Sequence, residues 1–102
     1  MNEKYELHPL TLAQSEFAAK NHDLVFQYLR SRNLPEDEFY GEVILGYLSA
    51  VQRYEEESWL RQYRFRSGAF AAMESAASSY RKNRAHQRER EVSFEEAALW
   101  AA

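Results

Sequence analysis

The sequence predicts an all-α fold, a compact domain of three to four helices. Only three Gly and two Pro interrupt the 102 residues, and so few obligatory breaks favour long helices over many short strands. Apolar residues also recur at helical steps along several segments. With 45% hydrophobic residues, we expect a single domain over residues 1–102, with its core at about residues 11–90 and a tail at 91–102.

The first helix is expected to begin near Thr11 and to end at Asn33. Arg30 and Arg32 near its end complement the negative pole of the helix dipole. Its apolar positions recur mostly at steps of three, four and seven, as a buried stripe requires. They are Phe17, Leu24, Val25, Tyr28 and Leu29.

The second helix is expected to begin with Pro35 at its first position, where the missing N–H costs nothing. The carboxylates of residues 36–38 follow in the first turn, where they complement the dipole. Gly41 and Gly46 each cost up to about 1 kcal/mol against Ala, so close packing or the approach of a partner would explain them. The core face consists of Phe39, Val43, Tyr47, Ala50, Val51 and Tyr54.

A loop or short helix is expected over residues 55–62, with Trp59 and Leu60 facing inward. Ser67 suits the N-cap of the last helix. The apolar positions of that helix are Ala69, Phe70, Met73, Ala76, Ala77 and Tyr80. The sequence RKNRAHQRER after residue 80 has little to bury, so whether it continues the helix is left open. The final VSFEEAALWAA is a weakly amphipathic tail that either docks or begins a linker.

Templates for catalysis and metal binding fit the chain poorly. It has no Cys, which excludes disulfides and thiolate sites. Its histidines, His8, His22 and His86, lack metal-site spacing, and no phosphate-binding glycine loop or GxSxG turn occurs. The carboxylates of residues 36–38 could hold a cation, but a helix N-terminus explains them better. We therefore expect no enzyme, no cofactor and no metal.

Several features of the sequence favour a cytoplasmic protein without a membrane partner. The absence of Cys fits a reducing compartment. The N-terminal sequence MNEKYELHPL is acidic and lacks the apolar core of a signal peptide. The longest apolar runs are only a few residues, too short to span a bilayer.

The charges of the chain are segregated. Residues 1–60 contain five Lys/Arg against eleven Asp/Glu, whereas residues 61–90 contain eight Lys/Arg against two Glu. This division indicates two partners of opposite charge, or a face for polyanions, or segregation without any partner.

The basic part of the chain contains interleaved aromatic residues. Tyr63 and Phe65 alternate with Arg61, Arg64 and Arg66. Arginines can pair with phosphates and the aromatic rings can stack on unpaired bases, although periodicity makes Tyr63 and Phe65 equally good core residues. Further basic residues follow at Arg81, Lys82, Arg84, Arg88 and Arg90.

Two stretches, in this order, resemble region 2 of the sigma-70-type sigma factors of bacterial RNA polymerase. EFYGEVILGYLSAVQRY (residues 38–54) is similar to DLxQEGxxGLxxAVxxF, and YRFRSGAFAAMESAASSY (residues 63–80) is similar to FSTYAxxxIRxAI. NHDLVFQYLRSRN (residues 21–33) and VSFEE (residues 92–96) resemble the flanking stretches. Each motif is a degenerate helical pattern, but their order and spacing together are more specific.

The resemblance implies a transcription initiation module with two binding surfaces. The first would dock on the clamp-helix coiled coil of the beta-prime subunit of the polymerase core; Glu38 and Glu42 lie one turn apart and share a face. Its residues would be Glu38, Gly41, Glu42, Leu45 and Leu48. The second surface would bind the promoter −10 element. Its residues would be Arg61, Arg64, Phe65, Arg66, Ser75, Ser79, Arg81, Lys82 and Arg84. The resemblance also allows an anti-sigma protein as a further partner.

The chain departs from the family pattern at several positions. Gly41 replaces a Gln of the core-binding motif, which puts one contact there in doubt. Gly68 stands where many primary factors have a stacking Tyr, Ala71 and Ala72 where they have a Trp pair, and Glu74 where a basic residue is common. Each lost stack is worth roughly 1–3 kcal/mol, so melting by the primary-factor geometry is in doubt.

These departures leave three hypotheses. The first is a divergent or alternative sigma-like factor that uses Phe65 or Phe70 differently. The second is a regulator limited to protein interaction, which docks on polymerase or another protein without melting a promoter. The third is an unrelated helical bundle whose basic tail binds RNA or nothing. The length leaves no room for region 4, so the resemblance implies either an excised domain or a relative made of region 2 alone.

Overall fold

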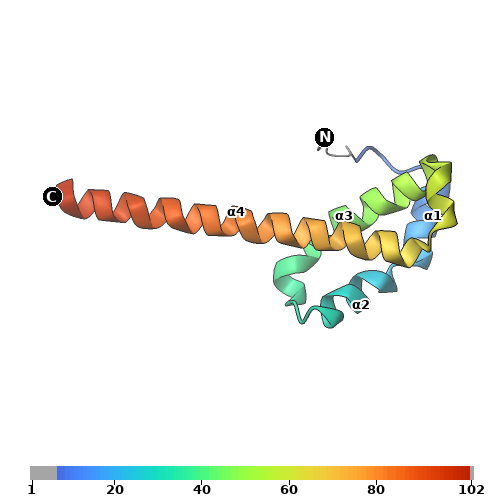
Figure 1. The fold of residues 1–102 in the computed structure, drawn as a ribbon, viewed down its shortest axis with the longest axis horizontal. Helices are drawn as coiled ribbons and strands as arrows, with labels where there is room; N and C mark the ends of the chain where they lie inside the picture. The colour runs from blue at the N-terminus through green and yellow to red at the C-terminus, as the bar shows by residue number, and fades with distance from the viewer. Residues whose placement is uncertain (1–6, 102) are drawn as a thin grey trace.

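The protein is an all-α domain, as the sequence predicts (Figure 1). The computed structural model describes the backbone of residues 7–101 and the side chains of residues 7–87. The elements are α1 (Leu12–Lys20), α2 (Asp23–Ser31), α3 (Glu36–Glu56), the short 3-10 helix η1 (Ser58–Gln62) and α4 (Phe65–Ala101).

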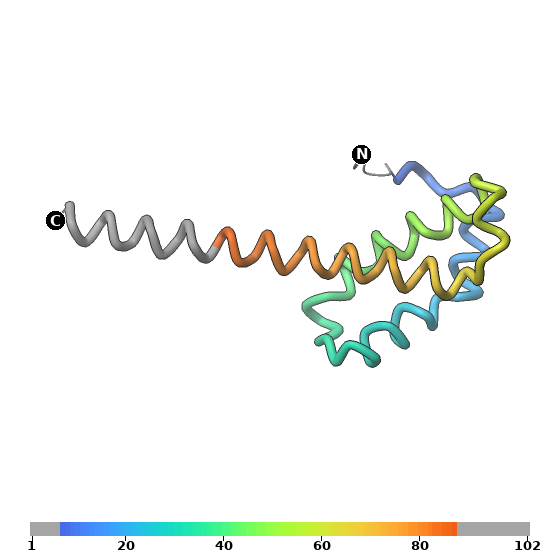
Figure 2. Tube along the Cα trace, in the orientation of Figure 1, coloured from blue at the N-terminus to red at the C-terminus, as the bar shows by residue number. Residues whose placement is uncertain are grey.

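Helix α3 is the centre of the fold. It contacts α1, α2, η1 and α4, and its most extensive contact is with α4. Figure 2 shows the chain passing from α3 through the η1 turn into α4, which runs back alongside α3. Helix α2 contacts both of these long helices, so it closes the bundle on one side.

The core lies where α2, α3 and α4 meet. Its buried side chains on α3 and α4 recur at steps of four, which confirms the central positions of the two predicted apolar faces. The buried apolar residues are Ala18, Val25, Tyr28, Leu29, Phe39, Val43, Tyr47, Val51, Ala69, Met73 and Ala77. The other predicted core positions of these two helices are half-buried, namely Ala50, Tyr54, Phe70, Ala76 and Tyr80.

Gly46 allows α3 and α4 to approach closely. A Cβ atom at this position would lie 2.7 Å from the backbone oxygen of Ala72 and 3.2 Å from the Cβ of Ala76. Real Cβ contacts are not this short, so any larger residue at 46 must push the helices apart. The packing explanation therefore holds for Gly46, but not for Gly41, where a Cβ would meet nothing within 4 Å.

The helix predicted between Thr11 and Asn33 is in fact two helices, α1 and α2. Its start is right: the Thr11 hydroxyl accepts from the Gln14 N–H, and the Gln14 side chain accepts from the Thr11 N–H, both at 3.1 Å. The break comes at Asn21. Its side-chain amide donates to the Phe17 carbonyl at 3.0 Å and so competes with backbone N–H groups for that acceptor at the end of α1. Asn33 ends α2 with a positive φ of 56°.

Three local predictions at the ends of α3 and α4 and in the turn between them need correction. Pro35 precedes α3 as its N-cap and is not its first residue. Trp59 does not face inward, because 58% of it is exposed, although Leu60 is half-buried. Ser67 lies within the first turn of α4, since its N–H already donates to the Arg64 carbonyl at 3.1 Å.

Helix α4 continues beyond residue 80, which answers the question left open by the sequence. In Figure 1 it extends past the end of the other helices. Whether the tail at residues 91–102 docks or begins a linker concerns side chains outside the described residues.

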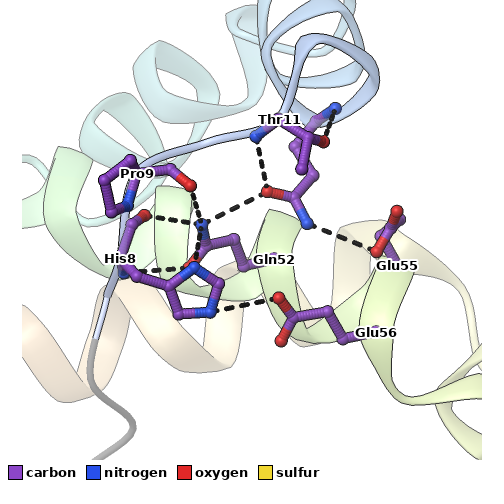
Figure 3. Close-up of polar contacts among 7 residues, drawn as sticks. His8, Pro9, Thr11, Gln52, Glu55 and Glu56 are labelled. Carbon is purple, nitrogen blue, oxygen red and sulfur yellow. Dashed lines mark hydrogen bonds and ion pairs between the residues drawn. The ribbon is translucent and has the colours of Figure 1, made fainter.

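Gln52 anchors the segment before α1 to α3 (Figure 3). Its side chain is completely buried. The Nε2 group donates to the His8 carbonyl at 2.6 Å and to the Gln14 Oε1 at 3.2 Å, while Oε1 accepts from the His8 N–H at 3.2 Å. These bonds satisfy a polar group that would be costly to bury alone. The sequence pattern did not reveal this anchor, because Gln52 falls beside the apolar stripe.

The two glycines of α3 should respond oppositely to the same substitution. We expect G46A to lower the free energy of unfolding by about 1–3 kcal/mol, because the added methyl group collides with α4. G41A should raise it by up to about 1 kcal/mol, because alanine is the better helix former and the site is open. Urea denaturation measures both, and an equal response would contradict the close approach at Gly46.

Candidate functional site

A cavity opens between the C-terminal half of α3, η1 and the start of α4. Its volume is about 200 Å³. A cavity of roughly 150 Å³ can hold a benzene ring, so this one is large enough for a single aromatic ring system. It is lined by Ser49, Ala50, Arg53, Tyr54, Leu60, Tyr63, Arg64, Phe65, Gly68 and Ala72.

Gly68 lines this cavity without a side chain. A Cβ at Gly68 would meet no atom within 4 Å, so the space around this position is open. A large side chain there, such as the Tyr of the family pattern, would project from the wall formed by the first turns of α4. Gly68 thus contributes no ring to this part of the wall.

The aromatic residues near the cavity fall into two groups. Phe65 is half-buried and packs edge to face against Phe17, with ring centroids 4.8 Å apart, and against Tyr54 at 5.3 Å. Tyr63 is instead 57% exposed, and its ring lies perpendicular to the exposed Trp59 with centroids 6.4 Å apart. Of the two residues that periodicity left undecided, Phe65 belongs with the packed interior and Tyr63 with the surface.

The three arginines around the start of α4 have different surroundings. Arg61 donates to the Glu55 carbonyl at 2.8 Å. Arg66 donates to the side chain of Gln27 and lies over the ring of Phe70, 4.4 Å from its centroid. Arg64 is exposed and lines the cavity. Arg64 is therefore the best placed of the three to meet an anion at the mouth of the cavity.

The predicted DNA-binding residues further along α4 divide between two faces. Ser75, Ser79 and Lys82 are exposed at steps of four and three, so they form one row that continues the line of Gly68. The others turn toward the beginning of α3. Arg81 lies over the ring of Phe39, 5.5 Å from its centroid.

Arg84 joins the two predicted surfaces. It forms an ion pair with Glu38, a predicted polymerase contact, and also lies over the ring of Tyr80. On the same surface of α3, Gly41, Glu42 and Leu45 are exposed.

Leu48 has different surroundings from the other predicted polymerase contacts. It is half-buried and packs against the core. The exposed part of the predicted docking surface is therefore centred on Glu42 and Leu45.

Glu74 links α4 to α2. Its Oε2 accepts from the Tyr28 hydroxyl at 2.5 Å and from Nε of Arg32 at 2.9 Å. These two hydrogen bonds lower the pKa of the Glu74 carboxyl below its ordinary value. Burial, followed by the hydrogen bond to Glu74, raises the pKa of Tyr28 to about 12. The carboxylate of Glu74 thus has structural partners in Tyr28 and Arg32.

Within the described residues, no group of three or more His, Asp or Glu side chains is arranged to hold a metal ion. None of the described helices has an apolar stretch long enough to cross a membrane. Comparisons of the chain with protein-family models, curated proteins and solved structures found no significant match. The candidate site therefore stands on its own geometry and on the sequence motifs.

E74Q should destabilise the fold in a pH-dependent way. Because the folded-state pKa of Glu74 is lowered, its carboxylate stabilises the fold above the ordinary value of 4.5. That contribution is lost as the pH falls through the folded-state pKa. We expect wild type to be more stable than E74Q near pH 7 and the gap to narrow below about pH 4.5. Urea denaturation at several pH values measures this. E16Q, on the exposed face of α1, is the control. A stability difference between wild type and E74Q that does not depend on pH, or an equal difference for E16Q, would contradict the stabilising link from Glu74 to α2.

Proposed function

We propose that the protein is a sigma-like transcription initiation module that binds core RNA polymerase through α3 and promoter −10 DNA through the cavity and α4. The observation that carries the proposal is the pairing of two unlike surfaces on the α3–α4 unit. An exposed acidic surface occupies the first half of α3, and an aromatic cavity with arginines lies at the other end of the pair. The order of the two sequence motifs matches the order of these surfaces.

The support for polymerase docking comes from Glu42 and Leu45. They lie three residues apart on α3, so they face the same way, and both are exposed. Leu45 is one of the few large apolar side chains of the described residues with about half its surface in water, at 52%. A carboxylate beside an exposed leucine suits a helical partner that carries both basic and apolar side chains.

The support for DNA binding comes from the cavity and the row on α4. Tyr63 and Arg64 at the cavity supply a ring for stacking and a cation for a phosphate. Lys82 lies further along α4, on the row that starts near the cavity. A single strand that entered the cavity with one base could therefore follow α4 with its backbone. Serines along the row, at 75 and 79, add hydroxyl groups that can donate to phosphates.

E42K should weaken the complex with core RNA polymerase by at least about tenfold, because a charge reversal at an interface costs on the order of 1.4 kcal/mol or more. A pull-down with purified core enzyme measures the effect. E16K is the matched control, since Glu16 is an exposed carboxylate on α1. Glu42 is a better site for this test than Glu38, because a charge reversal at Glu38 would also break the ion pair with Arg84. No binding by wild type, or equal binding by E42K and wild type, would contradict polymerase docking.

The double substitution of Arg64 and Lys82 by Gln should weaken binding to a single-stranded −10-like oligonucleotide. Each lost phosphate contact should reduce the slope of log affinity against log salt by about 0.7. Fluorescence anisotropy at a series of salt concentrations measures affinity and slope together. R30Q, which removes one exposed arginine from α2, should change neither.

The same titration separates the proposal from its main alternative. If wild type binds no single-stranded DNA even at low salt, while core polymerase still binds, the protein is a regulator limited to protein interaction.

A further inference from the structure

Five large apolar residues among the described side chains are exposed, and the two aromatic ones lie together. Trp59 is 58% exposed and Tyr63 is 57% exposed. Both belong to the turn around η1, and their rings are perpendicular with centroids 6.4 Å apart. Neither ring therefore covers the other in a parallel stack, so large aromatic faces remain open to solvent. Single exposed apolar residues are common, but adjoining exposed rings indicate a contact surface.

A basic side chain beside this aromatic pair can meet an anionic partner. Arg64 follows Tyr63 directly and is exposed at the same cavity. The carboxylates that precede η1 already have basic or amide partners within the protein. Glu55 accepts from Gln14 at 3.3 Å, Glu56 pairs with His8 at 3.1 Å, and Glu57 pairs with Arg53 at 3.4 Å.

The exposed row of α4 lacks aromatic rings. Gly68, which lines the cavity, is followed on this row by Ala71 and Ser75, and all three are exposed. Such a row can lie close to a nucleic-acid backbone, but it offers no ring on which a base can stack. If unpaired bases are held at this end of the molecule, rings must come from a neighbouring element. Helix η1 is that element, because Tyr63 at its end and Gly68 on α4 line the same cavity.

We propose that Trp59, with Tyr63 beside it, is a stacking platform for an unpaired base of single-stranded DNA at the mouth of the cavity. This role rests on the proposed DNA binding and adds Trp59 to the residues that would contact the strand. Trp59 lies in the spacer between the two sequence motifs, so the resemblance assigns it no role. The platform supplies from η1 the stacking surface that α4 does not provide.

The experiment compares W59A and W59F with their parent, all three carrying W100F, so that Trp59 is the only tryptophan of the parent. Anisotropy of a labelled single strand should show W59A binding roughly 5- to 150-fold more weakly, the range expected for the loss of one base stack. W59F should retain most of the affinity, because a ring is still present. The salt dependence should stay unchanged in W59A, because no phosphate contact is lost. Addition of the strand should also quench the fluorescence of Trp59 in the W100F protein.

Two controls separate stacking from general effects. L12A removes an exposed apolar side chain from α1, where 77% of Leu12 is exposed, and should bind like wild type. An oligonucleotide with abasic sites throughout its central part should bind W59A and its parent equally. Circular dichroism should show that W59A keeps its helical content, as the exposure of Trp59 predicts.

The outcomes distinguish this inference from the proposed function. If the parent protein binds single-stranded DNA and W59A binds equally well, the platform is wrong while DNA binding stands. A loss in W59A that persists on the abasic strand also overturns it. If the parent protein binds no single strand at low salt, the platform and the proposed DNA binding are both wrong.

Discussion

The close approach of α3 and α4 at Gly46 is the constraint on which the rest of the structure depends. The absence of a side chain at this position lets α3 lie almost against the backbone of Ala72. The buried residues of α3 and α4 then meet in one core, and α2 closes it. Tyr28 and Glu74 add a polar link between α2 and α4. Because interiors are packed as tightly as crystals, the positions of α3 and α4 are coupled where the two helices pack together.

This coupling is what gives the proposed function its geometry. The exposed surface around Glu42 belongs to the first half of α3, whereas the cavity is built from the second half of α3, η1 and the first turns of α4. Glu38 and Arg84, one from each proposed surface, form an ion pair. A partner that attracts the carboxylate of Glu38 would therefore leave the guanidinium of Arg84 without that contact. The two proposed surfaces are parts of one packed pair of helices.

The sequence predicted the elements that depend on periodicity and missed those that depend on single polar side chains. The apolar stripes of α3 and α4 were clear because core packing dictates their spacing. The break at Asn21 was not, since its apolar neighbours keep the helical spacing while one side-chain hydrogen bond ends α1. Gln52 gave no signal, because a buried amide is recognisable only by its partners. Trp59 was predicted to face inward but is exposed, and the cavity near it comes from three segments that only the fold brings together.

The most direct test of the account is to map the partners of α3 and η1 in one assembly. A photo-crosslinking amino acid would replace Glu42 or Tyr63 in separate samples that contain core polymerase and promoter DNA with an unpaired −10 segment. The account predicts crosslinks from position 42 to the clamp helices of the beta-prime subunit and from position 63 to the unpaired strand. Crosslinks from neither position, or from position 42 to DNA and position 63 to polymerase, would contradict the assignment of the two surfaces.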